Sequence, residues 1–319
     1  MASATGAAGA SKTLRHAGRI FANPDSGPRS VSIEDLSSLF PDDDVERMQP
    51  DRLAARIEAA IGDDRQVRFV GIAGGDGTVR SAAGVLSTSA SETPLLVVPT
   101  GTRNHFGGDL GIGTVDTAVA TAAKGVVRSV DVGRVNDARF VNNSSVGTYP
   151  NLVLERDQHE RRLPKRLGSI VAAWKQLRRG HRMTVEVDGA AQRVWAVFVG
   201  NNCYGDTVID LTGRQRLDEG VLDVRIVRAG GKLSRLRIAG AVLFGRVGRS
   251  PLIDRRSVSS VTIDAHGPVE VALDGEVEMM ASPLHYRSCP RALRVLVPRD
   301  GGGEVSTAAI QSSRDAWTR

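Results

Sequence analysis

Hydrophobic positions follow different patterns in the two halves of the chain. From residue 19 to about 131, short apolar runs alternate with segments in which apolar residues recur every three or four positions. The runs are typical of buried strands and the periodic segments of amphipathic helices, so their alternation predicts a parallel α/β sheet. We expect strands in RIFANP, VRFVGIA and PLLVVP, and helices in PDRLAARIEAAI, TVRSAAGVLSTS and TVDTAVATAAKG, the last between a Thr114 cap and a Gly125 stop.

Beyond residue 131 the pattern changes to short β-rich pieces separated by Gly, Asp or Asn turns. Such a series predicts a mostly antiparallel β domain. One segment, RLGSIVAAWKQLRRG, interrupts it, because its apolar residues have helical spacing. The expected fold class is therefore α/β plus mostly-β, with the parallel α/β domain placed first.

The length of 319 residues also favours two domains, since a single core seldom serves so long a chain. We expect an α/β domain over residues 19–133, completed by 285–298, and a β-rich substrate domain over 134–284. The ends, 1–18 and 299–319, are small or polar in composition and are expected to be flexible tails.

Composition favours an ordinary globular protein, with 41% hydrophobic and 24% charged residues. No apolar run approaches the roughly 20 residues that a membrane-spanning helix needs, and the N-terminal segment lacks the apolar core of a secretory signal. Two cysteines, Cys203 and Cys289, cannot build a disulfide framework. A cytoplasmic location is expected.

The chain is basic, with a net charge of +6 and a pI near 9.8. Lys and Arg concentrate between residues 156 and 182 and between 225 and 256. Such segments suit anionic partners such as nucleotides or an anionic membrane surface, and solvated faces often have the same composition. No nucleic-acid partner is expected, because aromatic residues amount to 4% and are not interleaved with the basic runs.

The sequence VRFVGIAGGDGTVRSAAGVL joins a predicted strand to a predicted helix through Gly74, Gly75, Asp76, Gly77 and Thr78. Glycines leave backbone N–H groups unhindered, and the N-terminus of the helix that follows binds phosphate well. Asp76 suits a Mg²⁺ ion that bridges phosphates. Thr78 is a candidate helix cap or phosphate donor. For the glycines alone, a plain structural corner is the competing interpretation.

Two similar turns follow neighbouring strands. PTGTRNHFGGDLGI contains Thr102 and Asn104, and FANPDSG contains Asn23, Ser26 and Gly27. Neighbouring parallel strands end at one edge of the sheet, where open α/β sheets bind ligands. Three such loops in succession therefore predict a nucleotide site.

The ordered set NPDSG, GGDGT, PTGTRN, VNNSSVG, VGNN, RLDEGVLDV and LDGEV resembles the diacylglycerol kinase catalytic family, above all its soluble bacterial lipid kinases. Sphingosine and ceramide kinases are more distant relatives. The likeness runs in order from about residue 19 to 298; GGDGT alone is also found in NAD kinases, whereas the late motifs are specific. The resemblance implies an NAD kinase/diacylglycerol kinase-like fold in which the second domain is an antiparallel β-sandwich.

The resemblance also implies an ATP- and Mg²⁺-dependent kinase that phosphorylates a lipid hydroxyl, with diacylglycerol as the default acceptor and phosphatidic acid as its product. In the family, the Glu of the Leu-Asp-Gly-Glu turn is the proton acceptor, which assigns this role to Glu276, with Asp76 as the second catalytic residue. The Asp274-Gly275 pair is also a favoured hairpin turn, which would hold Glu276 in position. The residues expected at the ATP phosphates are Asn23, Pro24, Asp25, Ser26, Gly27, Gly74, Gly75, Asp76, Gly77, Thr78 and Thr102.

Relatives also bind a structural Mg²⁺ through an acid just before the glycine of DEGVLDV, assisted by flanking backbone carbonyls. This pattern assigns a metal to Arg216, Glu219 and Val221. Relatives usually have Asp at the position of Glu219, so Asp218 is an alternative ligand. A solvated hairpin is the competing interpretation.

The chain departs from the family pattern at two places near the loops. Arg80-Ser81 follows GGDGT where most relatives have Asn-Glu, and His105-Phe106 follows GTRN where most have Asp-Phe. His105 is a candidate either for contact with the nucleotide or a lipid headgroup or for a structural role. Arg80 has no assigned role.

Several alternatives use the same fold. A sphingoid-base or other lipid kinase would need no different motif, whereas an NAD kinase would need an Asn-Glu pair and a Gly-Ser-Thr-Ala-Tyr-like stretch, which the chain lacks. A non-catalytic lipid- or nucleotide-binding regulator is disfavoured because Glu276 and Asp76 are present. The lipid kinase reading implies a cytoplasmic enzyme held peripherally on anionic lipid, and leaves open a homodimer paired through β domains.

Overall fold

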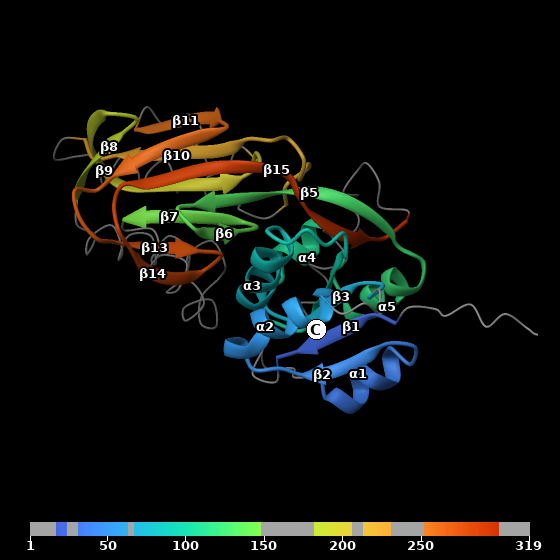
Figure 1. The fold of residues 1–319 in the computed structure, drawn as a ribbon. Coiled ribbons are helices and arrows are strands. Elements are labelled where there is room, and N and C mark those ends of the chain that lie inside the picture. The colour runs from blue at the N-terminus through green and yellow to red at the C-terminus, as the bar shows by residue number, and fades with distance from the viewer. Residues whose placement is uncertain are drawn as a thin grey trace, which may run out of the picture.

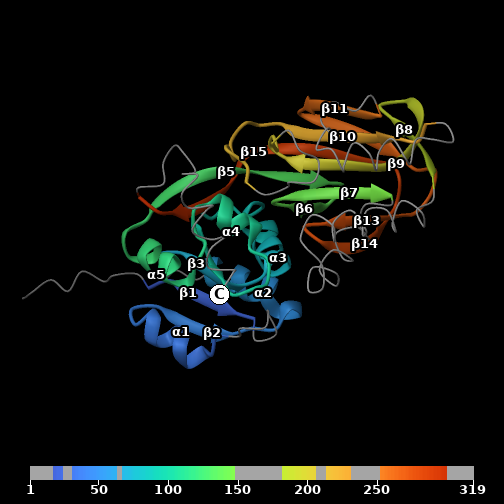
Figure 2. The same cartoon turned by 180° about the vertical axis from the view of Figure 1, so that it is seen from behind.

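The computed structural model describes residues 17–23, 31–62, 67–147, 182–205, 213–230 and 252–299. These residues form two lobes, one built on parallel strands with helices and one on antiparallel strands (Figure 1). The view from behind shows the same two lobes joined by long strands (Figure 2). The helix expected at 166–180, most of both basic segments and nearly all of both tails lie outside the described residues.

The predicted parallel sheet is confirmed. Its strands pair in the order β2-β1-β3-β4, and every pair is parallel. β3 and β4 are buried along their whole length, as their apolar runs indicate. The strands are β1 (Arg19–Ala22), β2 (Asp44–Arg47), β3 (Val70–Gly74) and β4 (Leu95–Pro99).

The helices of this lobe are α1 (Ile33–Leu39), α2 (Pro50–Gly62), α3 (Asp76–Leu86), α4 (His105–Asp109) and α5 (Val115–Lys124). For α5, the side chain of Thr114 accepts the backbone N–H of Thr117 and Gly125 ends the helix, as predicted. In contrast, α3 begins at Asp76, two residues before the expected start, because Gly75 is its N-cap. The interpretation of Thr78 as the cap is therefore wrong.

The second lobe is antiparallel, as the turn-rich pattern predicts. Its inward-facing residues form a separate core that includes Val146, Val199, Ile226 and Leu273. The strands are β6 (Ala138–Phe140), β7 (Asn143–Gly147), β8 (Met183–Val187), β9 (Ala190–Asn201), β10 (Leu222–Arg228), β11 (Ile253–Val258), β12 (Ser260–Asp264), β13 (Val269–Leu273) and β14 (Glu276–Met280).

Two long strands connect the lobes: β5 (Val126–Val135) and β15 (Leu284–Val297) pair with each other antiparallel. The start of β15 pairs with β12 in the second lobe, and Val295 near its end pairs in parallel with Leu95 of β4. Both strands contribute side chains to both cores. The relative position of the lobes is therefore set by continuous strands as well as by the side chains between them.

A buried arginine adds a polar connection between the lobes. The side chain of Arg214 has no exposed surface, and its Nε donates to Asp109 Oδ2 of α4 at 2.7 Å. Its terminal nitrogens donate to the Val141 carbonyl at 2.6 Å and to Asn142 Oδ1 at 2.9 Å. The donors of this guanidinium therefore have partners. A buried ion pair offsets its desolvation penalty only when its hydrogen-bonding groups are satisfied in this way.

Replacing Arg214 with Ala is expected to lower the free energy of unfolding by about 3 kcal/mol, because the buried Asp109 carboxylate would lose its cationic partner and the buried Asn142 Oδ1 would lose its donor. Urea unfolding followed by circular dichroism measures this loss. Arg56→Ala is the matched control, because the Arg56–Glu46 pair is exposed on both sides and should contribute less than about 1 kcal/mol. Equal effects of the two substitutions would contradict the role given to Arg214.

Candidate active site

The loops after β3 and β4 meet at the carboxyl edge of the parallel sheet, together with Asn23, the only described residue of the loop after β1. The strands end level with one another, since Ala22 pairs with Ala73 and Gly74 pairs with Pro99. The side chain of Asn23, directly after β1, donates to Thr78 Oγ1 at 3.2 Å. The loop after β4 comes so close to the loop after β3 that a Cβ on Gly101 would lie 2.5 Å from the Gly75 Cα.

The N-terminus of α3 fits a phosphate. Gly75 is extended, with φ −87° and ψ 179°, and provides no side-chain cap. The first backbone N–H groups of α3 thus lack the acceptor that a Ser or Asp cap would supply, and they carry the positive end of the helix dipole. Thr102 lies exposed in the adjacent loop, whereas Pro24, Asp25, Ser26 and Gly27 lie outside the described residues.

Asp76, the first residue of α3, fits a divalent cation. Its carboxylate accepts long hydrogen bonds from the backbone N–H of His105 at 3.3 Å and of Phe106 at 3.4 Å, and a further one from the side chain of Asn142. Burial raises the pKa of Asp76, although the nearby His105 opposes the shift. A carboxylate that is partly desolvated and weakly partnered gains from a cation, and Mg²⁺ prefers such oxygen ligands together with phosphate oxygens.

The turn between β13 and β14 is fastened to the segment after β6. Asp274 and Gly275 both have positive φ, 49° and 96°, as a two-residue hairpin of the predicted type requires. The Asp274 carboxylate accepts backbone N–H groups of Val141, Asn142 and Asn143 at 2.8, 2.7 and 3.0 Å. Burial nevertheless raises the pKa of Asp274 to about 6, and repulsion from Asp76 adds to the shift.

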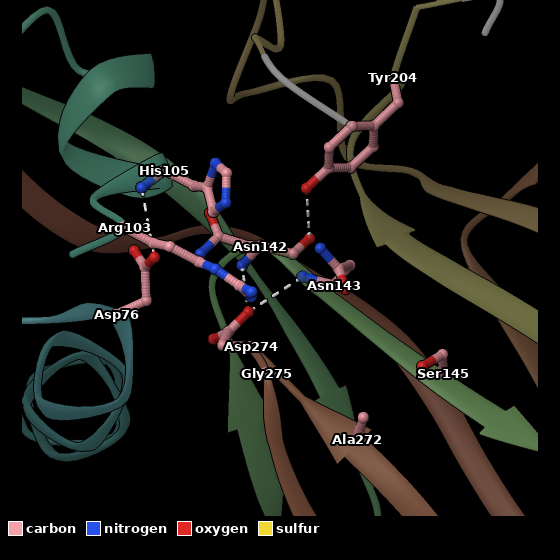
Figure 3. A pocket seen from close by; sticks show the side chains of 10 residues that line it. All are labelled: Asp76, Arg103, His105, Asn142, Asn143, Ser145, Tyr204, Ala272, Asp274 and Gly275. Carbon is pink, nitrogen blue, oxygen red and sulfur yellow. Dashed lines mark hydrogen bonds between the residues drawn. The ribbon is translucent and has the colours of Figure 1, made fainter. Parts of the chain in front are cut away.

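Asp76 and Asp274 line one pocket at the junction of the lobes (Figure 3). Sequence reasoning named Asp76 but gave no role to the pocket residues Arg103, Asn142, Asn143 and Tyr204. The signal was present in VNNSSVG, which served only to recognise the family, and in GTRN, of which only Thr102 and Asn104 were considered for the nucleotide site. Tyr204 could not be placed from its local sequence, because its hydroxyl reaches the pocket by donating to the Asn142 carbonyl at 2.9 Å.

Glu276, the expected proton acceptor, lies at the glycine loop. A Cβ built on Gly77 would be 2.0 Å from Glu276 Oε1, so the carboxylate sits directly beside the first turn of α3. The other oxygen, Oε2, accepts a hydrogen bond from Arg80 at 2.8 Å. The side chain of Glu276 is 55% exposed and is therefore accessible to a substrate. The fold thus brings the last motif of the sequence to the first lobe.

The residues expected at a structural Mg²⁺ have protein partners. Glu219 Oε2 accepts the backbone N–H of Cys203 at 2.9 Å, the Val221 carbonyl accepts that of Asn202 at 2.9 Å, and Arg216 pairs with Asp218 at 3.1 Å. Among the described residues, no three His, Cys, Asp or Glu side chains gather as a metal site. A metal held by Glu219 and backbone carbonyls stays a prediction.

A glycine loop after a parallel strand, a carboxylate suited to Mg²⁺ and a second carboxylate brought in by a β lobe define the class of two-domain kinases. Residues 18–135 match the model of the diacylglycerol kinase catalytic domain, and residues 144–297 match that of the YegS C-terminal NAD kinase beta sandwich-like domain. The chain belongs to this diacylglycerol kinase family, and the predicted identity as an ATP-dependent lipid kinase of two-domain type is confirmed.

Individual relatives agree with this assignment. A probable lipid kinase YegS-like of Pseudomonas aeruginosa is 29% identical over 266 residues, which cover 77% of this chain and 85% of that protein. The diacylglycerol kinase of Bacillus subtilis is 26% identical over 258 residues, covering 78% and 83%. A solved diacylglycerol kinase of Bacillus anthracis superposes with a TM-score of 0.63 at 19% identity, over 91% of this chain and 99% of that one, which shows the shared fold.

Proposed function

We propose that this kinase transfers the γ-phosphate of ATP to the free hydroxyl of diacylglycerol, with Mg²⁺ bound through Asp76. The observation that carries the proposal is the position of the Glu276 carboxylate beside Gly77 in the glycine loop. The proposed proton acceptor, Glu276, thus lies beside the proposed phosphate-binding N-terminus of α3. Similarity to a diacylglycerol kinase of Bacillus subtilis supports the choice of lipid.

In the proposed reaction, the lipid hydroxyl enters beside the β13–β14 turn and attacks the γ-phosphorus. A bond forms between the lipid oxygen and phosphorus, the bond from phosphorus to the β–γ bridging oxygen breaks, and ADP leaves. Glu276 takes the hydroxyl proton, while the N-terminus of α3 holds phosphate oxygens. Mg²⁺ would supply the charge that offsets the phosphates, and Asp274 fixes the turn that carries Glu276.

The same proposal places the enzyme on a membrane surface. None of the described helices has the length and apolar character needed to cross a bilayer. In the described part of the two segments expected to contact anionic lipid, Arg182 is exposed, whereas Arg228 and Arg256 pair with Asp254 and Arg255 pairs with Asp223. Each exposed cation near such a surface contributes about 1 kcal/mol. A homodimer paired through the β lobe is part of the proposal and is open to a sedimentation measurement.

Phosphate transfer from γ-labelled ATP to lipids in mixed micelles tests the function directly. The panel contains diacylglycerol, monoacylglycerol, ceramide, sphingosine and a crude lipid extract, with NAD as a soluble acceptor. We expect Mg²⁺-dependent label in diacylglycerol. Label in another lipid would change the substrate and keep the lipid kinase, label in NAD would overturn the lipid assignment, and ATP binding without transfer would favour a regulator.

Replacing Gly77 with Ala is expected to separate stability from activity. The new methyl group would displace the Glu276 carboxylate, whose end is flexible, and lower kcat by about 30-fold. Because Gly77 lies in α3, the same change should stabilise the fold by about 0.5 kcal/mol. Gly84→Ala in the same helix is the control, since its Cβ would meet only Arg139 at 4.0 Å. A full rate for Gly77→Ala would contradict the proposed place of Glu276 in the reaction.

A further inference from the structure

Arg80 connects the glycine loop to the strand that carries Glu276. It lies one turn after Asp76 in α3, and 13% of its side chain is exposed. Its Nη2 donates to Glu276 Oε2 at 2.8 Å and to Glu278 Oε1 at 2.6 Å. Alternate residues of a strand point to one side, so a single guanidinium holds both carboxylates of this side of β14.

The contact with Arg80 leaves one oxygen of Glu276 for other partners. Arg80 occupies Oε2, whereas Oε1 is the atom nearest to the Cβ position of Gly77. A glutamate side chain on an exposed strand has several rotamers of similar energy, and half of this side chain is exposed. The ion pair therefore selects one of these rotamers, and the selected one directs Oε1 to the phosphate-binding end of α3.

Charge gives a second reason for a cation here. Glu276 and Glu278 would place two negative charges beside a loop that is proposed to receive a triphosphate. The guanidinium is charged at all physiological pH values and offsets part of this repulsion. The Nε atom of Arg80 is buried without a hydrogen-bond partner among the described residues, which limits the side chain to its contacts through the terminal nitrogens.

We propose that Arg80 is a positioning residue for phosphoryl transfer, which holds the Glu276 carboxylate at the glycine loop. This inference rests on the proposed function, because it requires Glu276 to act on the lipid hydroxyl. The family pattern has a neutral Asn where this chain has Arg80, and a neutral side chain cannot form the same ion pair. The contact of Arg80 with Glu276 and Glu278 is thus a feature of this sequence that the family pattern lacks.

The test is a double-mutant cycle between Arg80 and Glu276, measured as lipid phosphorylation with Mg²⁺–ATP. We expect Arg80→Ala to lower kcat by about 30-fold and to change the KM for ATP by less than about threefold. Arg80→Lys, which retains one charged donor, should recover most of the rate. In the Glu276→Gln background, Arg80→Ala should cause no further loss, because it acts through the carboxylate that is already absent.

Arg56→Ala, which breaks an exposed Arg–Glu pair of α2 and β2, controls for the loss of a surface cation and should have the wild-type rate. If Arg80 has a purely structural role, Arg80→Ala should slow the Glu276→Gln enzyme by the same factor as the wild type. That result would overturn the inference. A slow Glu276→Gln enzyme together with a full rate for Arg80→Ala would overturn the inference and keep the proposed function. A full rate for Glu276→Gln would overturn both.

Discussion

Replacing Glu276 with Gln is expected to lower kcat for lipid phosphorylation by about 10³-fold. The amide keeps the size of the side chain and can still accept a hydrogen bond from Arg80, but it cannot take the proton of the attacking hydroxyl. A loss of this size corresponds to about 4 kcal/mol of transition-state stabilisation. Since Glu276 is 55% exposed, the fold should tolerate the change. Steady-state kinetics in mixed micelles, with unfolding measured in parallel, give both quantities.

Glu270→Gln is the matched control for this experiment. Glu270 is an exposed glutamate of the adjacent strand β13 and pairs across the strands with Met279. Its neutralisation removes the same charge a few residues away and should leave kcat unchanged. If both variants slow the reaction equally, the effect belongs to the net charge of the hairpin and the catalytic role of Glu276 is wrong. ATP binding in the Glu276→Gln enzyme should stay within about threefold of the wild type.

The parallel lobe could be predicted from the sequence because each of its elements has a local signal. Buried strands such as β4 are continuous apolar runs, and α5 has both a cap and a stop residue. The crossing strand β5 was missed, since its first half is exposed and its apolar residues are not continuous. It is a strand because it pairs with β15, which lies far along the chain, and such pairing has no local signature.

The site could be predicted only as a set of motifs. GGDGT and LDGEV were recognised separately, and the loops at the edge of the sheet followed from the parallel order of the strands. The role of Asp274 was not predicted beyond a turn, because its carboxylate accepts hydrogen bonds from the backbone N–H groups of Val141, Asn142 and Asn143. Those contacts join segments more than a hundred residues apart, and nothing in the composition of either segment encodes them.

Arg80 is a second case in which the contacts of a residue could not be predicted from the sequence. The sequence identified it as a departure from the family pattern at a position next to the glycine loop. Its physical meaning appears only when β14 is placed against α3, so that one guanidinium meets Glu276 and Glu278. An unexpected residue near a motif is thus a useful signal, but its partners come from the tertiary structure.

Neutralising Asp76 is expected to abolish the Mg²⁺ dependence of ATP binding and to lower kcat/KM by about 10³-fold. Asn keeps one oxygen but loses the charge that a divalent cation needs at this weakly partnered position. Because burial raises the pKa of Asp76, the neutral side chain should not destabilise the fold without ligand, and the Tm of Asp76→Asn should equal or exceed that of the wild type.

Calorimetric titration with ATP, in the presence of Mg²⁺ or of a chelator, separates these effects. The wild type should bind ATP more tightly with Mg²⁺, whereas Asp76→Asn should show one affinity in both conditions. Asp116→Asn, which neutralises an exposed acid in the first turn of α5, controls for the loss of charge at a helix N-terminus and should behave as the wild type. If Mg²⁺ still strengthens ATP binding in Asp76→Asn, the cation must be bound by other carboxylates. Asp274 would then be the first to consider, because it lines the same pocket.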